Sequence, residues 1–226
     1  MTTTFDFERA RFNMIEQQIR PWDVLDPAVL ELLSVVKRED FVPPAYRNVA
    51  LADIEVPLNV TGAAKGEKML FPRVEARVLQ ELGLGADETV LEIGTGSGYM
   101  AALLAAKSRH VTTVEIDPAL ARFAEGNLSL AGVRNAKVVV ADGARGLPEL
   151  GSFDVIVISG GLPMLPAAFT SQLKVGGRLI AFVGAGIVME AVLVTKTGEQ
   201  SAQQRNLFET RVQMLRNAET PSTFRF

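Results

Sequence analysis

The sequence predicts an α/β fold: a doubly wound, mostly parallel seven-strand sheet with an N-terminal helical segment. Three observations lead to this prediction. From residue 89 onward, short apolar runs rich in β-branched residues alternate with helix-like stretches. The runs are apolar almost throughout, which is typical of strands that helices cover on both faces. The last two runs follow each other without a helix, which predicts an antiparallel pair at one edge.

Two helices are predicted near the N-terminus. Apolar residues recur at a helical spacing over residues 5–19, and Pro21 ends that stretch. Asp26 followed by Pro27 then indicates a second helix start, because aspartate caps free N–H groups and proline suits the first turn. The run "AVLELLSVV" continues this helix, and "EDFVPP" ends the unit.

A flap and a third helix are predicted next. Residues 50–71 show no sustained period and contain glycines and lysines, which suits a mobile flap with short extended pieces. A helix is predicted over residues 72–82, because Pro72 opens it and Gly83 follows its last apolar residue.

The remaining residues supply the sheet. The predicted strands are, in order, "TVLEIG", "VTTVEID", "AKVVVADG", "FDVIVISG", "GGRLIAFVG", "VMEAVLVTK" and "FETRVQML". Helices are predicted between them over residues 99–107, 118–131 and 166–173. We expect one domain over residues 1–226, in which 1–82 form the helical segment and flap and 83–226 form the α/β body.

Composition excludes several classes of function. The chain has 226 residues and a net charge of −3, so no broad basic field exists for nucleic acid or an anionic membrane. It has no cysteine and only His110, which argues against thiol catalysis, a histidine-built metal site and a Ser-His-Asp triad. A protein, peptide or small molecule is the expected substrate. The start lacks the apolar core of a signal peptide, so a cytoplasmic location is expected.

The stretch "VLEIGTGSGY" is the first candidate binding motif. Gly94, Gly96 and Gly98 follow a predicted buried strand, where missing Cβ atoms let backbone N–H groups approach a ligand. A plain tight turn is the alternative interpretation. The dinucleotide fingerprint requires glycine at its sixth position, which is Tyr99 here, so the spacing argues against a pyrophosphate ligand.

Acidic residues at the next two strand ends sharpen the prediction. Glu115 comes about twenty residues after the loop, where a carboxylate can bind both hydroxyls of a ribose. Asp142 and Gly143 end the following strand, where they can meet an adenine edge. Each acid alone can equally be a solvated strand end, but together with the loop they favour S-adenosylmethionine as the cofactor.

These motifs resemble the seven-strand, Rossmann-like methyltransferases. The similarity lies in "VLEIGTGSGY", "VEIDPAL", "ADGARGLPELGSFDVIVISGGLP" and "LKVGGRLIAFVG". The chain most resembles the protein-L-isoaspartate O-methyltransferases, which repair damaged aspartyl sites by methylating the isoaspartyl carboxylate. The segments "MIEQQIR", "VLDPAVLELLSVVKREDFVPP" and "ALADIEVPL" also resemble that family, so the resemblance covers nearly the whole chain.

The resemblance implies a set of cofactor-binding residues. Glu92 is expected near the methionine ammonium and Glu115 at the ribose hydroxyls. Ser159, at the end of the fourth strand, is expected to face the cofactor or substrate pocket, although it can also simply cap the strand. The residues expected around the methionine part, the ribose and the adenine are Gly94, Thr95, Gly96, Ser97, Gly98, Asp142 and Gly143.

One departure from the family concerns the substrate. The family carries a motif similar to Thr-Ile-Ser-Gln-Pro, whose hydroxyl faces the substrate carboxylate. In this chain Pro72 follows "KMLF", which places Lys68 at the threonine and Leu70 at the hydroxyl. No shift brings a serine or threonine next to Pro72, and Thr61 lies well upstream. The segment from residue 53 to 72 is also longer than is usual in the family.

Losing this hydroxyl need not abolish methyl transfer, because an ionised carboxylate needs no general base and catalysis is mostly positioning. We expect weak or absent activity on isoaspartyl peptides, unless Lys65, Lys68 or Arg73 pairs with the carboxylate; each can also be an ordinary solvated charge. No catalytic residue is assigned. The alternatives are a family offshoot that methylates another carboxylate or hydroxyl on a small molecule or peptide, and a non-catalytic cofactor-binding protein whose flap contacts a partner.

Overall fold

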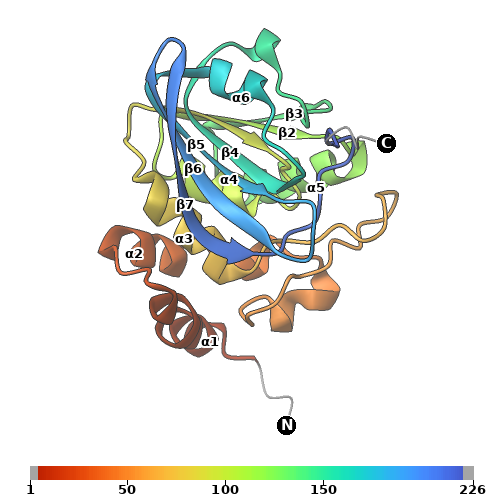
Figure 1. The fold of residues 1–226 in the computed structure, drawn as a ribbon. Coiled ribbons are helices and arrows are strands. Elements are labelled where there is room, and N and C mark those ends of the chain that lie inside the picture. The colour runs from red at the N-terminus through yellow and green to blue at the C-terminus, as the bar shows by residue number, and fades with distance from the viewer. Residues whose placement is uncertain (1–4, 221–226) are drawn as a thin grey trace.

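A computed structural model describes residues 5–220, and its centre is one seven-stranded sheet (Figure 1). The strands lie in the order β3-β2-β1-β4-β5-β6-β7. Strands β1 to β5 are parallel, and β6 runs antiparallel to both of its neighbours. The strand bounds are β1 Thr89–Ile93, β2 His110–Glu115, β3 Ala136–Val140, β4 Phe153–Leu162, β5 Leu173–Val183, β6 Met189–Gly198 and β7 Ser201–Thr210.

This topology confirms the predicted doubly wound sheet with an antiparallel edge, and it places the site. The strand order reverses between β1 and β4, which are neighbours in the sheet. In open α/β sheets the ligand binds at the carboxyl ends of the strands beside this reversal. The ends of β1 and β4 are therefore where a cofactor site is expected.

The helices begin largely where their sequence signals predict. Asp26 caps α2 by accepting a hydrogen bond from the N–H of Ala28 (2.8 Å), and Asp117 caps α5 in the same way. Gly83 ends α3 in a left-handed conformation. The helix bounds are α1 Phe7–Met14, α2 Pro27–Val35, α3 Pro72–Leu82, α4 Tyr99–Ala105, α5 Pro118–Leu130 and α6 Ala167–Ser171. Within the described residues, no helix is long and apolar enough to cross a membrane.

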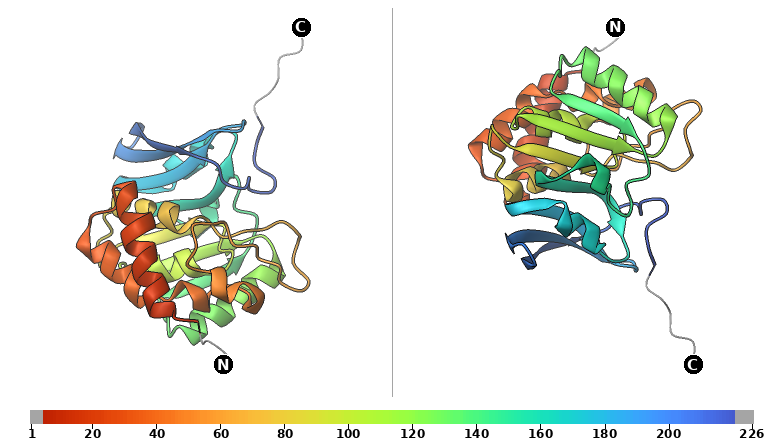
Figure 2. Two further views of the ribbon diagram at one scale, coloured as in Figure 1. Left: turned by 90° about the horizontal axis from the view of Figure 1, so that it is seen from below. Right: turned by 90° about the horizontal axis from the view of Figure 1, so that it is seen from above.

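Successive residues of each central strand serve opposite faces of the sheet. Val90 packs into the core beneath the N-terminal helices, α3 and α4, whereas Leu91 packs into the core that contains Phe169 of α6. The N-terminal segment, red to orange in Figure 2, lies against one side of the sheet. This double burial is why the strands carry almost continuous apolar runs.

Three predicted elements differ from the structure. The first helix is regular only to Met14 and continues as a π-helical turn over Ile15–Ile19. The helix predicted over 166–173 is shorter, because β5 begins at Leu173 and not at residue 176. The prediction of the last strand over residues 208–215 is wrong in its bounds, because β7 spans Ser201–Thr210. Its first residues are exposed and polar and pair through their backbone with β6, so they carry no apolar signal.

Residues 50–71 form the predicted loop. The stretch from Pro57 to Lys68, called the flap below, folds back on itself through an antiparallel bridge between these two residues. Residues 213–217, called the C-terminal segment below, follow β7 and lie beside the end of β4. Gly161 donates to the carbonyl of Gln213 (2.7 Å) and accepts from Leu215 (2.9 Å).

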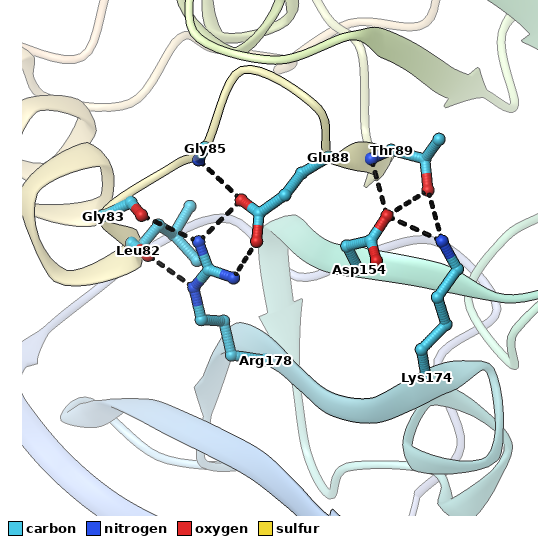
Figure 3. A network of polar contacts seen from close by, with 8 residues as sticks. All are labelled: Leu82, Gly83, Gly85, Glu88, Thr89, Asp154, Lys174 and Arg178. Carbon is cyan, nitrogen blue, oxygen red and sulfur yellow. Dashed lines mark hydrogen bonds and ion pairs between the residues drawn. The ribbon is translucent and has the colours of Figure 1, made fainter.

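A polar network holds the opposite end of the sheet (Figure 3). Arg178 of β5 donates to both carboxylate oxygens of Glu88 (2.6 and 2.9 Å) and to the carbonyl of Gly83 (2.9 Å). Asp154 accepts hydrogen bonds from Lys174 (2.7 Å) and from the N–H of Thr89 (2.8 Å). These contacts tie the end of α3 and the starts of β1, β4 and β5 together, away from the site.

Candidate active site

A cleft opens where β1 to β4 end. It brings together six residues predicted to bind the cofactor: Gly94, Gly96, Glu115, Asp142, Gly143 and Ser159. The flap contributes Leu58, Glu67 and Lys68 to the walls, and the C-terminal segment contributes residues 213–216. The cleft therefore lies at the predicted edge of the sheet and is covered by two segments distant in sequence.

The glycine loop has a backbone that other residues rarely adopt. Gly94, Gly96 and Gly98 have φ angles of 93°, 54° and 83°. Gly94 and Gly96 line the cleft, whereas a Cβ atom on Gly98 would meet Ala124 and Leu128 of α5 at 3.3 Å. The first two glycines thus keep the cleft wall bare, and Gly98 permits close packing of α5 instead of facing the cleft.

The two acids at the strand ends, Glu115 and Asp142, both line the cleft. Glu115 is buried, and its Oε2 accepts a hydrogen bond from the N–H of Gly96 (2.9 Å) while its Oε1 accepts from Asp117 (3.0 Å). Asp142 accepts from Asn217 of the C-terminal segment (2.8 Å). A carboxylate has about four acceptor sites, so both side chains retain capacity for a ligand.

Glu92 lies behind the cleft rather than in its wall. It is fully buried, and its oxygens accept hydrogen bonds from Thr113 (2.7 Å) and Ser159 (3.0 Å). The Thr113 hydroxyl also contacts that of Thr95 (2.6 Å). Burial raises the pKa of Glu92 to about 8, although both hydroxyls act in the opposite direction. Ser159 is the member of this network that faces the cleft.

A second, smaller cavity adjoins the cleft. Its residues come from the flap and the loop after it, from α3, from the glycine loop and from α4: Lys68, Met69, Leu70, Glu75, Gly94, Thr95, Gly96, Ser97, Met100 and Ser159. Lys68, Gly94, Gly96 and Ser159 border both hollows. The remaining members of the predicted cofactor set, Thr95 and Ser97, therefore face this cavity.

Leu70, the residue matched to the family hydroxyl in the sequence, lines this cavity. Its side chain is buried, and its carbonyl accepts a hydrogen bond from Arg38 (2.6 Å). Of the three candidate cations, only Lys68 borders the site, where it pairs with Glu55 (3.4 Å). Arg73 instead pairs with Asp53 and lies over aromatic rings. Lys65 and Thr61 are exposed and line neither hollow.

Sequence reasoning missed the C-terminal segment. Arg216 reaches the flap residue Glu67 (3.4 Å) and also Asp117 (3.5 Å), and Gln213 donates to Glu67 (3.1 Å). A Cβ atom on Gly160 would lie only 2.5 Å from Cδ2 of Leu215, so Leu215 packs directly against the glycine backbone. The two glycines that end "FDVIVISGG" are the signal that would have indicated a close neighbour there.

The strand order, the bare glycine loop and the acids at successive strand ends define a Rossmann-like methyltransferase that uses S-adenosylmethionine. The family model described as protein-L-isoaspartate(D-aspartate) O-methyltransferase matches residues 9–219, and the chain belongs to this family.

Curated relatives agree with this assignment. A protein-L-isoaspartate O-methyltransferase of Rhodopseudomonas palustris is 39% identical over 207 residues, which are 91% of this chain and 93% of the relative. One from Magnetococcus marinus is 38% identical over 87% of this chain and 84% of the relative. A solved structure of the same name has a TM-score of 0.76 at 26% identity and covers 92% of this chain and 65% of that chain.

A structure from Plasmodium falciparum shows the same fold. It has a TM-score of 0.78 at 19% identity, and the alignment covers 93% of this chain and 98% of that chain. It is described as a protein-L-isoaspartate O-methyltransferase in complex with S-adenosyl-L-homocysteine, the demethylated form of the cofactor.

Proposed function

We propose that this chain transfers the methyl group of S-adenosylmethionine to the carboxylate of isoaspartyl residues in proteins and peptides. The observation that carries the proposal is the junction of the cleft with the smaller cavity, bordered by Lys68, Gly94, Gly96 and Ser159. A nucleoside in the cleft and an acceptor in the cavity meet at this one place. The family membership supplies the class of acceptor.

The cleft residues fit the cofactor chemically. The bare walls at Gly94 and Gly96 admit its methionine part, Glu115 has acceptor capacity for two ribose hydroxyls, and Asp142 with Gly143 borders the place for adenine. When bound, the cofactor supplies a methyl group on a positively charged sulfur. Glu92 acts through Ser159, which it orients, because only the hydroxyl reaches the cleft.

The chain's own task is to position the acceptor and to exclude water. The acceptor carboxylate is ionised at neutral pH and attacks as it stands, so no side chain has to remove a proton from it. Lys68 provides positive charge at the junction, and the buried Leu70 side chain keeps the cavity wall dry. Methyl transfer then depends on alignment.

A second candidate is methylation of a different carboxylate on a peptide or small molecule. Leu70 favours it, because an apolar side chain stands where the family places a hydroxyl. The cytoplasmic location and the division of one domain at residues 82 and 83 remain predictions of the sequence.

A methyl-transfer assay with labelled cofactor tests the proposal. Purified protein is offered a synthetic isoaspartyl peptide in one reaction and a cell extract in another. Label in the peptide supports isoaspartyl methylation. Label only in components of the extract, with the peptide unmodified, contradicts it and favours the second candidate.

A further inference from the structure

A buried carboxylate residue lines the smaller cavity, which is called the acceptor cavity below. Glu75, in the first turn of α3, lines this cavity together with Leu70 and the glycine loop, and only 3% of its surface is exposed. A buried charged group is unfavourable unless it is paired or neutralised. The hydrogen-bond partners of Glu75 therefore decide which of its oxygens can contact an acceptor.

Only one of its two oxygens is paired within the described residues. Arg38 donates through Nε to Oε2 of Glu75 (3.1 Å) and through its other nitrogens to the carbonyls of Ala50 and Leu70. No hydrogen bond from the described part of the chain reaches Oε1 of Glu75. The guanidinium is thus committed to the protein, and Oε1 is a free polar atom in the wall that also contains Leu70.

We propose that Glu75, in its protonated form, donates a hydrogen bond from Oε1 to the acceptor carboxylate and so positions it, replacing the donor that Leu70 cannot provide. This inference rests on the proposed function, because it assumes an anionic acceptor in the cavity. An ionised Glu75 would repel that acceptor, whereas the protonated form binds it.

Burial favours the protonated form of Glu75, whereas the positive charge of Arg38 beside it opposes that form. Arg38 faces it from the 3-10 turn Arg38–Asp40, Glu92 from β1 and the neutral Tyr99 from α4, while Lys68 borders the same cavity. Burial raises the pKa of Glu75 to about 7, although Arg38 acts in the opposite direction.

Further from Glu75, the buried side chains of Arg11 and Glu39 form an ion pair with each other, so their charges largely cancel. An acceptor anion beside Oε1 raises the pKa of Glu75 further, because two like charges oppose ionisation. The protonated form is therefore the one that binds an acceptor at and below neutral pH.

Steady-state kinetics against pH test the inference with saturating S-adenosylmethionine and an isoaspartyl peptide. Because only protonated Glu75 binds the acceptor, KM for the peptide should rise about 30-fold between about pH 6 and about pH 8.5, with kcat little changed. In Glu75→Gln the amide can accept from Arg38 and donate into the cavity at every pH, so KM should stay low and flat. In Glu75→Leu, which lacks a donor, KM should be high throughout.

Cofactor affinity at each pH, measured by calorimetry with S-adenosylhomocysteine, separates this role from others. Titration of Glu92 acts on the cofactor side and would change that affinity, whereas the inference requires the KM effect at saturating cofactor. A flat KM for the wild-type protein overturns the inference and leaves the proposed function intact, whether or not the variants fold. No turnover of the peptide at any pH overturns both.

Discussion

Replacing Leu70 by serine tests whether the missing hydroxyl limits the rate. Leu70 lines the acceptor cavity and is 92% buried, so a serine there places a donor beside the acceptor. A hydrogen bond to a charged partner contributes about 1.5–3 kcal/mol, and a neutral one about 0.5–1.5 kcal/mol. A gain near 1.4 kcal/mol in the transition state corresponds to about a tenfold rise in kcat/KM. We therefore predict that Leu70→Ser is about tenfold faster on isoaspartyl peptides.

The substitution also has a structural cost that must be separated from this gain. Removing a buried leucine side chain destabilises a protein by about 2–5 kcal/mol, a sizeable part of a typical total. Leu70→Ala is the matched control, because it removes the same bulk and adds no hydroxyl. Melting temperatures with bound S-adenosylhomocysteine show whether both variants remain folded under the assay conditions.

The assay compares initial rates of the wild-type protein, Leu70→Ser and Leu70→Ala at saturating cofactor. The gain should be larger at about pH 8.5 than at about pH 6, because ionised Glu75 no longer donates at the higher pH. The reasoning is refuted if Leu70→Ser is no faster than Leu70→Ala at either pH. It is also refuted if the wild-type protein at high pH equals a relative that carries the hydroxyl.

Two other predictions concern the cofactor and stability. Gly96→Val should abolish binding of S-adenosylhomocysteine, because φ is 54° at this position and a Cβ atom would lie 3.3 Å from Leu58. Gly126→Ala, in open space on α5, is the control and should leave binding unchanged. Calorimetry that shows equal affinities for the two variants, or binding of NAD, would contradict the assignment. Burial alone would raise the pKa of Asp154, but hydrogen bonds from Lys174 and Thr89 outweigh it and hold the pKa at about 2, below its ordinary 3.8. Asp154→Asn should therefore lower the free energy of unfolding by about 2 kcal/mol at neutral pH. Urea titrations should show this difference fading as the pH falls from about 4 to 2. A difference that persists at pH 2 would refute the contacts of Asp154 with Lys174 and Thr89 as its cause.

The parts of the fold that could be predicted are those with a local signal. Asp26 with Pro27, and Pro72 with Gly83, mark helix ends through their own hydrogen-bonding capacity. Apolar runs mark the central strands because both faces are buried. The start of β7 carries no such signal, because its exposed polar residues are strand only through backbone pairing with β6.

The site residues also divide into those with a local sequence signal and those without one. Gly94, Glu115 and Asp142 lie at or just after strand ends, so their meeting at one edge follows from the parallel topology. Glu75 could not be placed, because only tertiary packing brings that turn of α3 against the glycine loop and leaves Oε1 unpaired. The C-terminal segment, including Leu215, reaches the cleft through long-range pairing with the end of β4.

The most direct measurement of the central claim is the ratio of kcat/KM for two peptides of identical sequence, one with an isoaspartyl and one with an aspartyl residue. The relatives' shared activity and the junction of cleft and cavity predict transfer to the isoaspartyl peptide and little to its partner. The measurement is made with saturating S-adenosylmethionine at about pH 6, where Glu75 is protonated. Equal transfer to both peptides, or none to either while cofactor binding is intact, would contradict the account.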